Sequence, residues 1–116
     1  MFNDNEIRRI ATYLNIDFTK FPFEDFKRGI NIELEHGISN KDTNVTNDDL
    51  LKTAKIALAH LNEYPNYYNK DYGLLVFENF LNDKLKQKTS LMWSLIFQTN
   101  HFTYHILYIV SRKWFI

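Results

Sequence analysis

Apolar side chains recur at every third or fourth position over most of the first 88 residues, which is the period of an α-helix with one buried face. The pattern predicts four helices, over residues 4–15, 22–36, 47–64 and 74–88. Their apolar stripes consist of Ile7, Ile10, Ala11 and Leu14; Phe23, Phe26, Ile30 and Leu34; Leu50, Ala54, Ala57, Leu58 and Leu61; and Leu74, Phe77, Leu81 and Leu85. We therefore expect a mainly α protein, a compact bundle of four to five helices.

Residues that start or stop helices separate these segments. Asn3 or Asp4 can cap the first helix. Thr46 begins a Thr-Asn-Asp-Asp run that resembles a capping box for the third helix, with Asp where Glu is usual. Gly37 suits the end of the second helix, and Pro65 prevents the third from continuing.

Small residues interrupt two of the predicted helix faces. Gly29 lies inside the second helix, where glycine costs about 1 kcal/mol relative to alanine. Ala54 and Ala57 lie on the main apolar face of the third helix. We expect another part of the chain to approach closely at these positions.

The stretch 89–111 contains no Asp, Glu, Lys or Arg and is long enough to span a bilayer. Polar side chains near its middle make a membrane span unfavourable. Two other interpretations are a pair of helices broken near Asn100, and a β-hairpin of residues 91–97 and 102–110. We favour helix, because the rest of the chain has helical periodicity.

The chain of 116 residues is long enough for one domain with a single core. It has no cysteine, which excludes thiolate metal sites, and no secretory leader is visible after Met1, so we expect a cytoplasmic protein. Residues 1–73 carry nine Lys/Arg and twelve Asp/Glu, whereas residues 74–116 carry five and two. Nucleic-acid binding through the basic C-terminal half is therefore an alternative function, although the neutral net charge does not favour it.

Two Glu/His pairs are the candidate metal ligands. Glu33 and His36 form an E-x-x-H pair, and His60 and Glu63 form the reverse order. Inward-facing E-x-x-H pairs hold di-iron centres in helical bundles, so iron or zinc is the alternative to no cofactor. Helical phase places Glu33 at the border of its apolar stripe and Glu63 nearly opposite the main apolar face of its helix. Buried or rim hydrogen bonds by Glu33 and His60 are the simpler interpretation.

His101 and His105 are four residues apart and would align on a helix. Phe102 stands where the metalloprotease motif H-E-x-x-H requires Glu. A zinc site shared with Glu33 and His36 is one interpretation, and polar interruptions of a packed segment are the preferred one.

Three separated motifs, IELEHG, TNVTNDD and KIALAHLNEYPNYY, resemble the uncharacterised family called domain of unknown function 5661, small proteins of bacteria and their phages. The resemblance covers roughly residues 7–68. It implies no activity and assigns no catalytic residue. We therefore treat residues 1–73 as a family-like helical part and residues 74–116 as a divergent, aromatic-rich extension of one domain.

These observations favour a small protein that is not an enzyme and that binds another protein. A concrete version is a phage or mobile-element inhibitor of a host or defence enzyme, such as a CRISPR-type nuclease. The extension supplies the kinds of side chain that dominate protein interfaces. The candidate interface residues are Trp93, Tyr104, Tyr108, Trp114 and Phe115. The alternatives are a tail that completes the core or a homodimer, and a metal-dependent enzyme that uses the Glu/His site.

Overall fold

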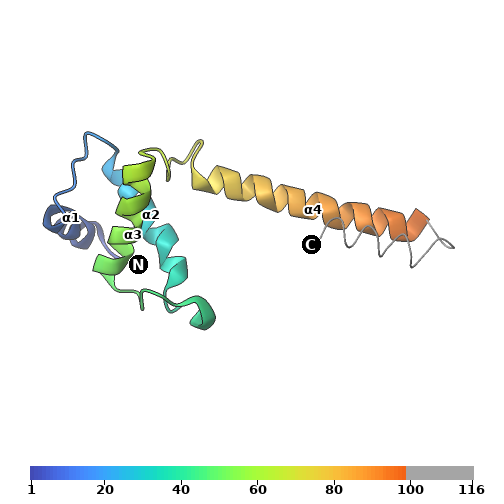
Figure 1. Cartoon of the computed structure of the whole chain (residues 1–116), viewed down its shortest axis with the longest axis horizontal. Helices are drawn as coiled ribbons and strands as arrows, with labels where there is room; N and C mark the ends of the chain where they lie inside the picture. The colour runs from blue at the N-terminus through green and yellow to red at the C-terminus, as the bar shows by residue number, and fades with distance from the viewer. Residues whose placement is uncertain (99–116) are drawn as a thin grey trace. The chain divides into compact units, whose positions relative to one another are not determined.

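The computed structural model describes residues 1–98, and the chain divides into two units, residues 1–76 and residues 77–116. The helices are α1 (Asp4–Tyr13), α2 (Phe23–Glu33), α3 (Leu50–Glu63) and α4 (Leu74–Gln98), with short 3-10 helices η1 (Leu34–His36) and η2 (Lys41–Thr43) between α2 and α3 (Figure 1). All regular structure within the described residues is helical, which confirms the predicted mainly α fold.

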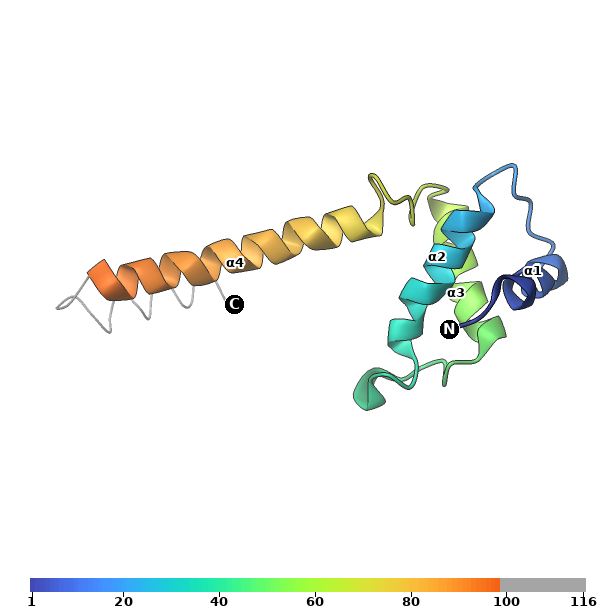
Figure 2. The ribbon, with the colours of Figure 1, turned by 180° about the vertical axis from the view of Figure 1, so that it is seen from behind.

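Three helices share one core in the unit formed by residues 1–76, here called the three-helix unit. Helices α2 and α3 lie side by side and run in opposite directions, and α1 packs against α3 (Figures 1 and 2). An ion pair between Lys27 Nζ and Asp4 Oδ1, at 2.8 Å, links α2 to the start of α1. The buried core consists of Ile7, Ala11, Phe21, Phe26, Ile30, Ala54, Ala57, Leu61 and Tyr68. Most of these residues belong to the apolar stripes that the sequence predicts.

The start of α1 follows the sequence closely. Asn3 is the N-cap, and its Oδ1 accepts a hydrogen bond from Glu6 N at 2.9 Å. In return, Asn3 N donates to Glu6 Oε2 at 3.0 Å. This reciprocal capping box settles the choice between Asn3 and Asp4.

The predicted cap of the third helix was wrong. Asp49, not Thr46, caps α3 by accepting a hydrogen bond from Lys52 N at 2.8 Å. Asn47 and Asp48 adopt left-handed backbone conformations, with φ of 51° and 58°, so a right-handed helix cannot begin before them. Thr46 is instead buried, and its hydroxyl accepts a hydrogen bond from Asp48 N at 3.3 Å.

Glycine permits close contact at two places. A Cβ at Gly29 would lie 2.6 Å from ring carbons of Tyr68, which confirms that a neighbour approaches this position closely. The second helix stops before Gly37, as predicted, although its last three residues form η1. Gly37 has a φ of −101°, so left-handed backbone is not the reason for glycine there. A Cβ at Gly37 would overlap the carboxylate of Asp48.

Helix α4 is longer than the sequence pattern predicts. It continues to Gln98, ten residues beyond the predicted end at Lys88, so the lysines near residue 86 lie within the helix and not at its end. Residues 91–97, the first strand of the alternative hairpin, are therefore helical. The second strand, residues 102–110, and the break near Asn100 lie outside the described residues. Within residues 1–98, no helix combines the length and hydrophobicity needed to cross a membrane.

Candidate functional site

Three polar side chains from distant parts of the sequence meet inside the three-helix unit. Glu33 comes from the end of α2, His60 from the last turn of α3, and Tyr68 from the loop after α3. The Tyr68 hydroxyl donates a short hydrogen bond to Glu33 Oε1. His60 Nδ1 lies 2.7 Å from the Tyr68 hydroxyl oxygen and 3.1 Å from Glu33 Oε1. Glu33 and Tyr68 are almost completely buried, so this network joins two helices and a loop.

The proton positions in this network follow from the donors available. A tyrosine hydroxyl has one proton, and Tyr68 uses it to donate a hydrogen bond to Glu33. His60 Nδ1 must therefore carry a proton to bond to either oxygen, which assigns the tautomer from the network. Burial, and then the hydrogen bond to Glu33, raise the pKa of Tyr68 well above its ordinary value. Tyr68 consequently stays protonated near neutral pH and is unsuited to act as a base or nucleophile.

The loop that carries Tyr68 is held by further contacts. The Tyr67 ring stacks on His60, with centroids 4.4 Å apart and planes 13° from parallel. Arg28 Nη1 donates to the backbone oxygen of Tyr68 at 3.0 Å and to Asp25 Oδ1 at 2.8 Å. These contacts fix the loop over Gly29 and leave the Tyr68 ring little freedom to move.

Two of the four predicted metal ligands, His36 and His60, lie on either side of the carboxylate of a third, Glu33. Glu33 contacts His60 through Oε1, and its Oε2 lies 3.7 Å from His36 Nε2. His36 is half exposed and lies 3.3 Å from Glu35 Oε1, whereas Glu63 is exposed and lies outside this network. Over the described part of the chain, no three His, Asp or Glu side chains are placed to hold a metal ion. Glu33 and His60 make the hydrogen bond that the simpler interpretation expected, buried at Glu33 and at the rim at His60. His101 and His105 lie outside the described residues.

A second polar cluster joins the end of η1 to the turn before α3. Asp48 Oδ1 accepts a hydrogen bond from Ile38 N at 2.9 Å. The backbone oxygen of His36 accepts from Val45 N at 2.7 Å and from Thr46 N at 3.3 Å. The two clusters together connect all three of the sequence motifs, IELEHG, TNVTNDD and KIALAHLNEYPNYY, to one another.

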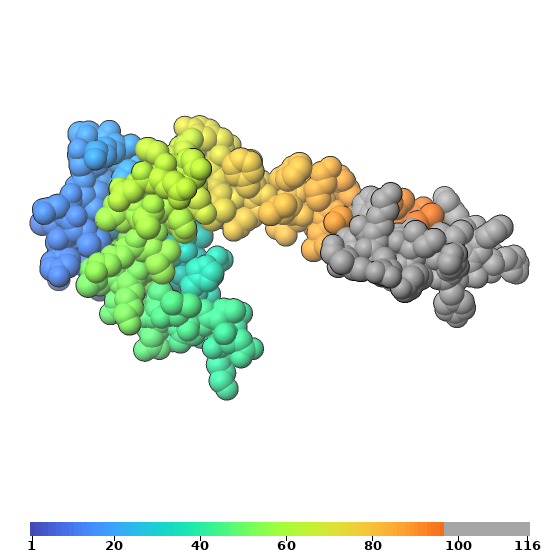
Figure 3. All heavy atoms as spheres, viewed as in Figure 1, coloured from blue at the N-terminus to red at the C-terminus, as the bar shows by residue number. Residues whose placement is uncertain are grey.

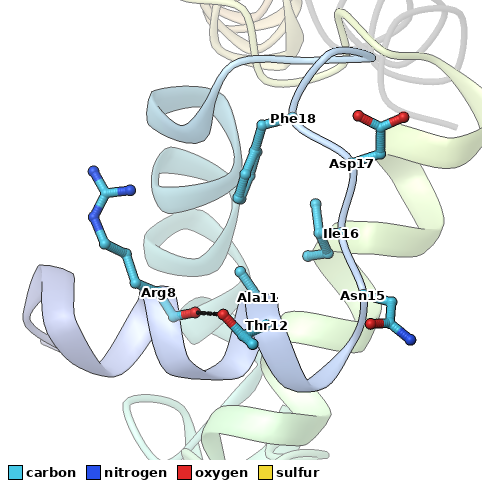
Figure 4. Close-up of a pocket in the computed structure, with 7 residues that line it drawn as sticks. All are labelled: Arg8, Ala11, Thr12, Asn15, Ile16, Asp17 and Phe18. Carbon is cyan, nitrogen blue, oxygen red and sulfur yellow. Dashed lines mark hydrogen bonds between the residues drawn. The ribbon is translucent and has the colours of Figure 1, made fainter.

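A hollow of about 480 Å³, which the sequence pattern does not predict, lies between α1 and the loop after it (Figure 4). Arg8 lies over the Phe23 ring, 3.9 Å from its centroid, and the Thr12 hydroxyl donates to the backbone oxygen of Arg8 at 3.0 Å. Asp17 accepts hydrogen bonds from the amide and hydroxyl of Thr19, which hold the pKa of Asp17 below its ordinary value. The polar groups of this hollow therefore serve local structure and do not converge on a common point.

Helix α4 presents large apolar side chains to solvent (yellow to orange in Figure 3). Phe77, Leu81 and Leu85 lie four residues apart on one face and are 64%, 64% and 56% exposed. Trp93, one of the predicted interface residues, is also more than half exposed. The other four predicted interface residues lie outside the described part of the chain; they are Tyr104, Tyr108, Trp114 and Phe115. The sequence prediction placed the interface in the aromatic tail and did not include Phe77, Leu81 or Leu85.

Comparison with known proteins identifies the N-terminal part of the chain. Neither the curated proteins nor the solved structures contain a significant match. The sequence model of one family, described as "Protein of unknown function (DUF5661)", matches residues 7–74. This match covers more than half of the chain and includes all three motifs, so the protein belongs to the DUF5661 family of proteins of unknown function.

Proposed function

We propose that the chain is a non-catalytic protein-binding module and that α4 supplies its binding surface. The observation that carries this proposal is the row of exposed apolar side chains Phe77, Leu81 and Leu85. Covering one such side chain is worth roughly 1.5–3 kcal/mol, and contiguous apolar surface of this kind marks interaction sites. Aromatic side chains such as Phe77 and Phe80 are enriched in protein interfaces.

The polar network of the three-helix unit supports a structural role. The Tyr68 hydroxyl and Glu33 Oε1 are directed at each other and at His60 Nδ1. Both Glu33 and Tyr68 are too deeply buried to touch a substrate. We infer that this network stabilises the joint between α2, α3 and the following loop.

A narrower proposal concerns the partner. We propose that it is a host or defence enzyme, such as a CRISPR-type nuclease, which the chain inhibits by occupying one of its surfaces. Support comes from the position of the exposed row. The family match ends at residue 74, so the binding helix lies almost entirely outside the matched region.

Partner capture with matched variants tests the proposal. In Leu81→Glu/Leu85→Glu, two charges enter the exposed row, and we expect retention of the partner to fall at least roughly tenfold. In Asn79→Glu/Gln87→Glu, the same charges lie on the opposite face of α4 and retention should persist. Equal retention by the wild type and both variants would contradict the proposal.

A metal-dependent enzyme is the alternative, and the proximity of His36 and His60 to Glu33 is the observation that favours it. Elemental analysis of the purified protein separates the two functions. Stoichiometric iron or zinc that is lost in Glu33→Gln would contradict our proposal.

Nucleic-acid binding is a second alternative, and it rests on the basic residues of the C-terminal half. Of these, Arg112 and Lys113 lie outside the described residues, and Lys84, Lys86 and Lys88 belong to α4. At 100° per residue, Lys86 lies on the far side of the helix from the other two, so the three lysines do not form one basic stripe. Affinity for duplex DNA that falls steeply with salt would support this alternative.

A further inference from the structure

A seam with the spacing of a coiled coil runs along α4. Residues along this seam alternate steps of three and four positions, the spacing at which helices pair side by side. The seam consists of Glu78, Leu81, Leu85, Lys88, Met92 and Leu95. Leu81 and Leu85 are strongly exposed, and the charged members Glu78 and Lys88 have opposite signs and enclose the two leucines.

The seam is self-complementary about the level of Asp83. Glu78 and Lys88 lie five residues before and after Asp83, and Leu81 and Leu85 lie two residues before and after it. An antiparallel second copy, related by a two-fold axis at this level, would therefore place its Lys88 against Glu78 and its Leu85 against Leu81. A parallel, in-register pair would instead place Glu78 against Glu78 and Lys88 against Lys88, which is unfavourable.

We propose that α4 binds α4 of a second copy of this chain in antiparallel orientation, with the two-fold axis at Asp83. The inference rests on the proposed function of α4 as a binding surface, and a second copy would compete with the proposed enzyme partner for that surface. Beside the seam, Phe77 would lie next to Leu91 of the second copy, and both side chains are at least 40% exposed in the single chain. The two Lys84 side chains would meet on this flank near the axis and would oppose the pairing.

Charge complementarity is the reason for choosing a second copy over an unrelated partner. Only the chain itself is certain to present the same two charges, at the same separation, around the same two leucines. The geometry also requires each contact to occur twice, so the two Glu78–Lys88 contacts and the two Leu81–Leu85 contacts act together.

Sedimentation equilibrium of the full chain tests the pairing. We expect a monomer–dimer equilibrium in the wild type. Glu78→Lys or Lys88→Glu alone would create two like-charge contacts and raise the dissociation constant roughly 10- to 30-fold, if each contact contributes about as much as an exposed ion pair. Glu78→Lys/Lys88→Glu would restore opposite charges across the antiparallel pair and return the dissociation constant close to that of the wild type. Circular dichroism of each variant establishes that α4 remains helical.

Several outcomes would overturn the inference. A monomeric wild type at concentrations up to roughly 1 mM would do so, because a second copy would not then cover α4. A double variant that associates as weakly as the single variants would exclude the antiparallel pairing. If the chain is monomeric but Leu81→Glu/Leu85→Glu still abolishes retention of another protein, only this inference fails. If that variant alters neither self-association nor retention, the proposed function fails as well.

Discussion

The three-helix unit and α4 differ in how far contacts within the chain cover or pair their side chains. In the three-helix unit, the buried polar side chains Asp25, Glu33, Thr46 and Thr53 each have a hydrogen-bond partner. In α4, Phe77, Phe80 and Leu81 are all more than half exposed. Among the described residues, Asn31 Oδ1 is a buried side-chain oxygen of this unit that lacks a hydrogen-bond partner. The buried polar side chains of the three-helix unit are thus largely paired within one chain, whereas the exposed apolar side chains of α4 gain stability only when another surface covers them.

The family match coincides with the three-helix unit. Residues 7–74 contain the motifs whose side chains form the Glu33–His60–Tyr68 network and the Asp48 contact with Ile38. The motifs that identify the family are thus accounted for by contacts that hold the three-helix unit together. The matched residues therefore make up the three-helix unit, whereas α4 lies almost entirely beyond them.

The largest expected effect comes from Gly29→Ala, which tests whether the three-helix unit is as tightly packed as its contacts indicate. Helix propensity alone would stabilise the protein by about 1 kcal/mol. The added methyl group would collide with the buried Tyr68 ring, so we expect a net loss of about 2 kcal/mol in the free energy of unfolding. Urea denaturation measures this change in the free energy of unfolding. Ala59→Gly, on the exposed face of α3, is the control for the difference in helix propensity between alanine and glycine. A Gly29→Ala variant more stable than the wild type would show that the Tyr68 ring moves aside for the added methyl group.

Tyr68→Phe should have a smaller effect and tests the polar network alone. The ring and its packing remain, but Glu33 loses the hydroxyl donor and keeps only His60 on Oε1. We expect a loss of about 1 kcal/mol in the free energy of unfolding near neutral pH. An unchanged unfolding midpoint in urea would mean that the network contributes no stability.

The stability difference between the wild type and Tyr68→Phe should depend on pH, in a direction set by the raised pKa of Tyr68. The pKa of Tyr68 is raised in the folded state, so its stabilising contribution is fully present below the unfolded pKa of about 10. Above that pH the unfolded chain releases the Tyr68 proton while the folded chain retains it, and stability is lost at up to about 1.4 kcal/mol per pH unit. The stability difference between wild type and Tyr68→Phe should therefore shrink above pH 10. A constant difference from pH 8 to 11 would contradict the raised pKa.

Helical periodicity predicted most of the three-helix unit because its core faces are regular. Ile7, Phe26, Ala54 and Leu61 all lie where a period of 3.6 residues places them. The same periodicity put Glu33 at the border of its stripe and suggested hydrogen bonds for it. The periodicity did not predict Tyr68 as the hydrogen-bond partner of Glu33, because the approach of Tyr68 depends on how the loop after α3 returns over α2.

Two local features escaped prediction for different physical reasons. The left-handed conformations of Asn47 and Asp48 moved the cap of α3 from Thr46 to Asp49, and no hydrophobic pattern reports backbone dihedral angles. The extent of α4 was underestimated because basic residues ending at Lys88 resemble a helix C-terminus, while the following residues carry no charge.

Lys84→Gln should have the smallest effect, and it tests the second half of the comparison, the need of α4 for a partner. In the proposed antiparallel pair, the two Lys84 side chains approach each other near the two-fold axis, and this repulsion is relieved when their charge is removed. We expect dimer affinity to increase about two- to fivefold at low salt, with less gain at high salt as screening weakens the repulsion. Lys86→Gln removes the same charge from the outer face of α4, so it is the matched control and should leave the dissociation constant unchanged. Equal effects of the two variants would point to net charge rather than this contact, whereas a selective gain in Lys84→Gln supports an antiparallel seam centred on Asp83.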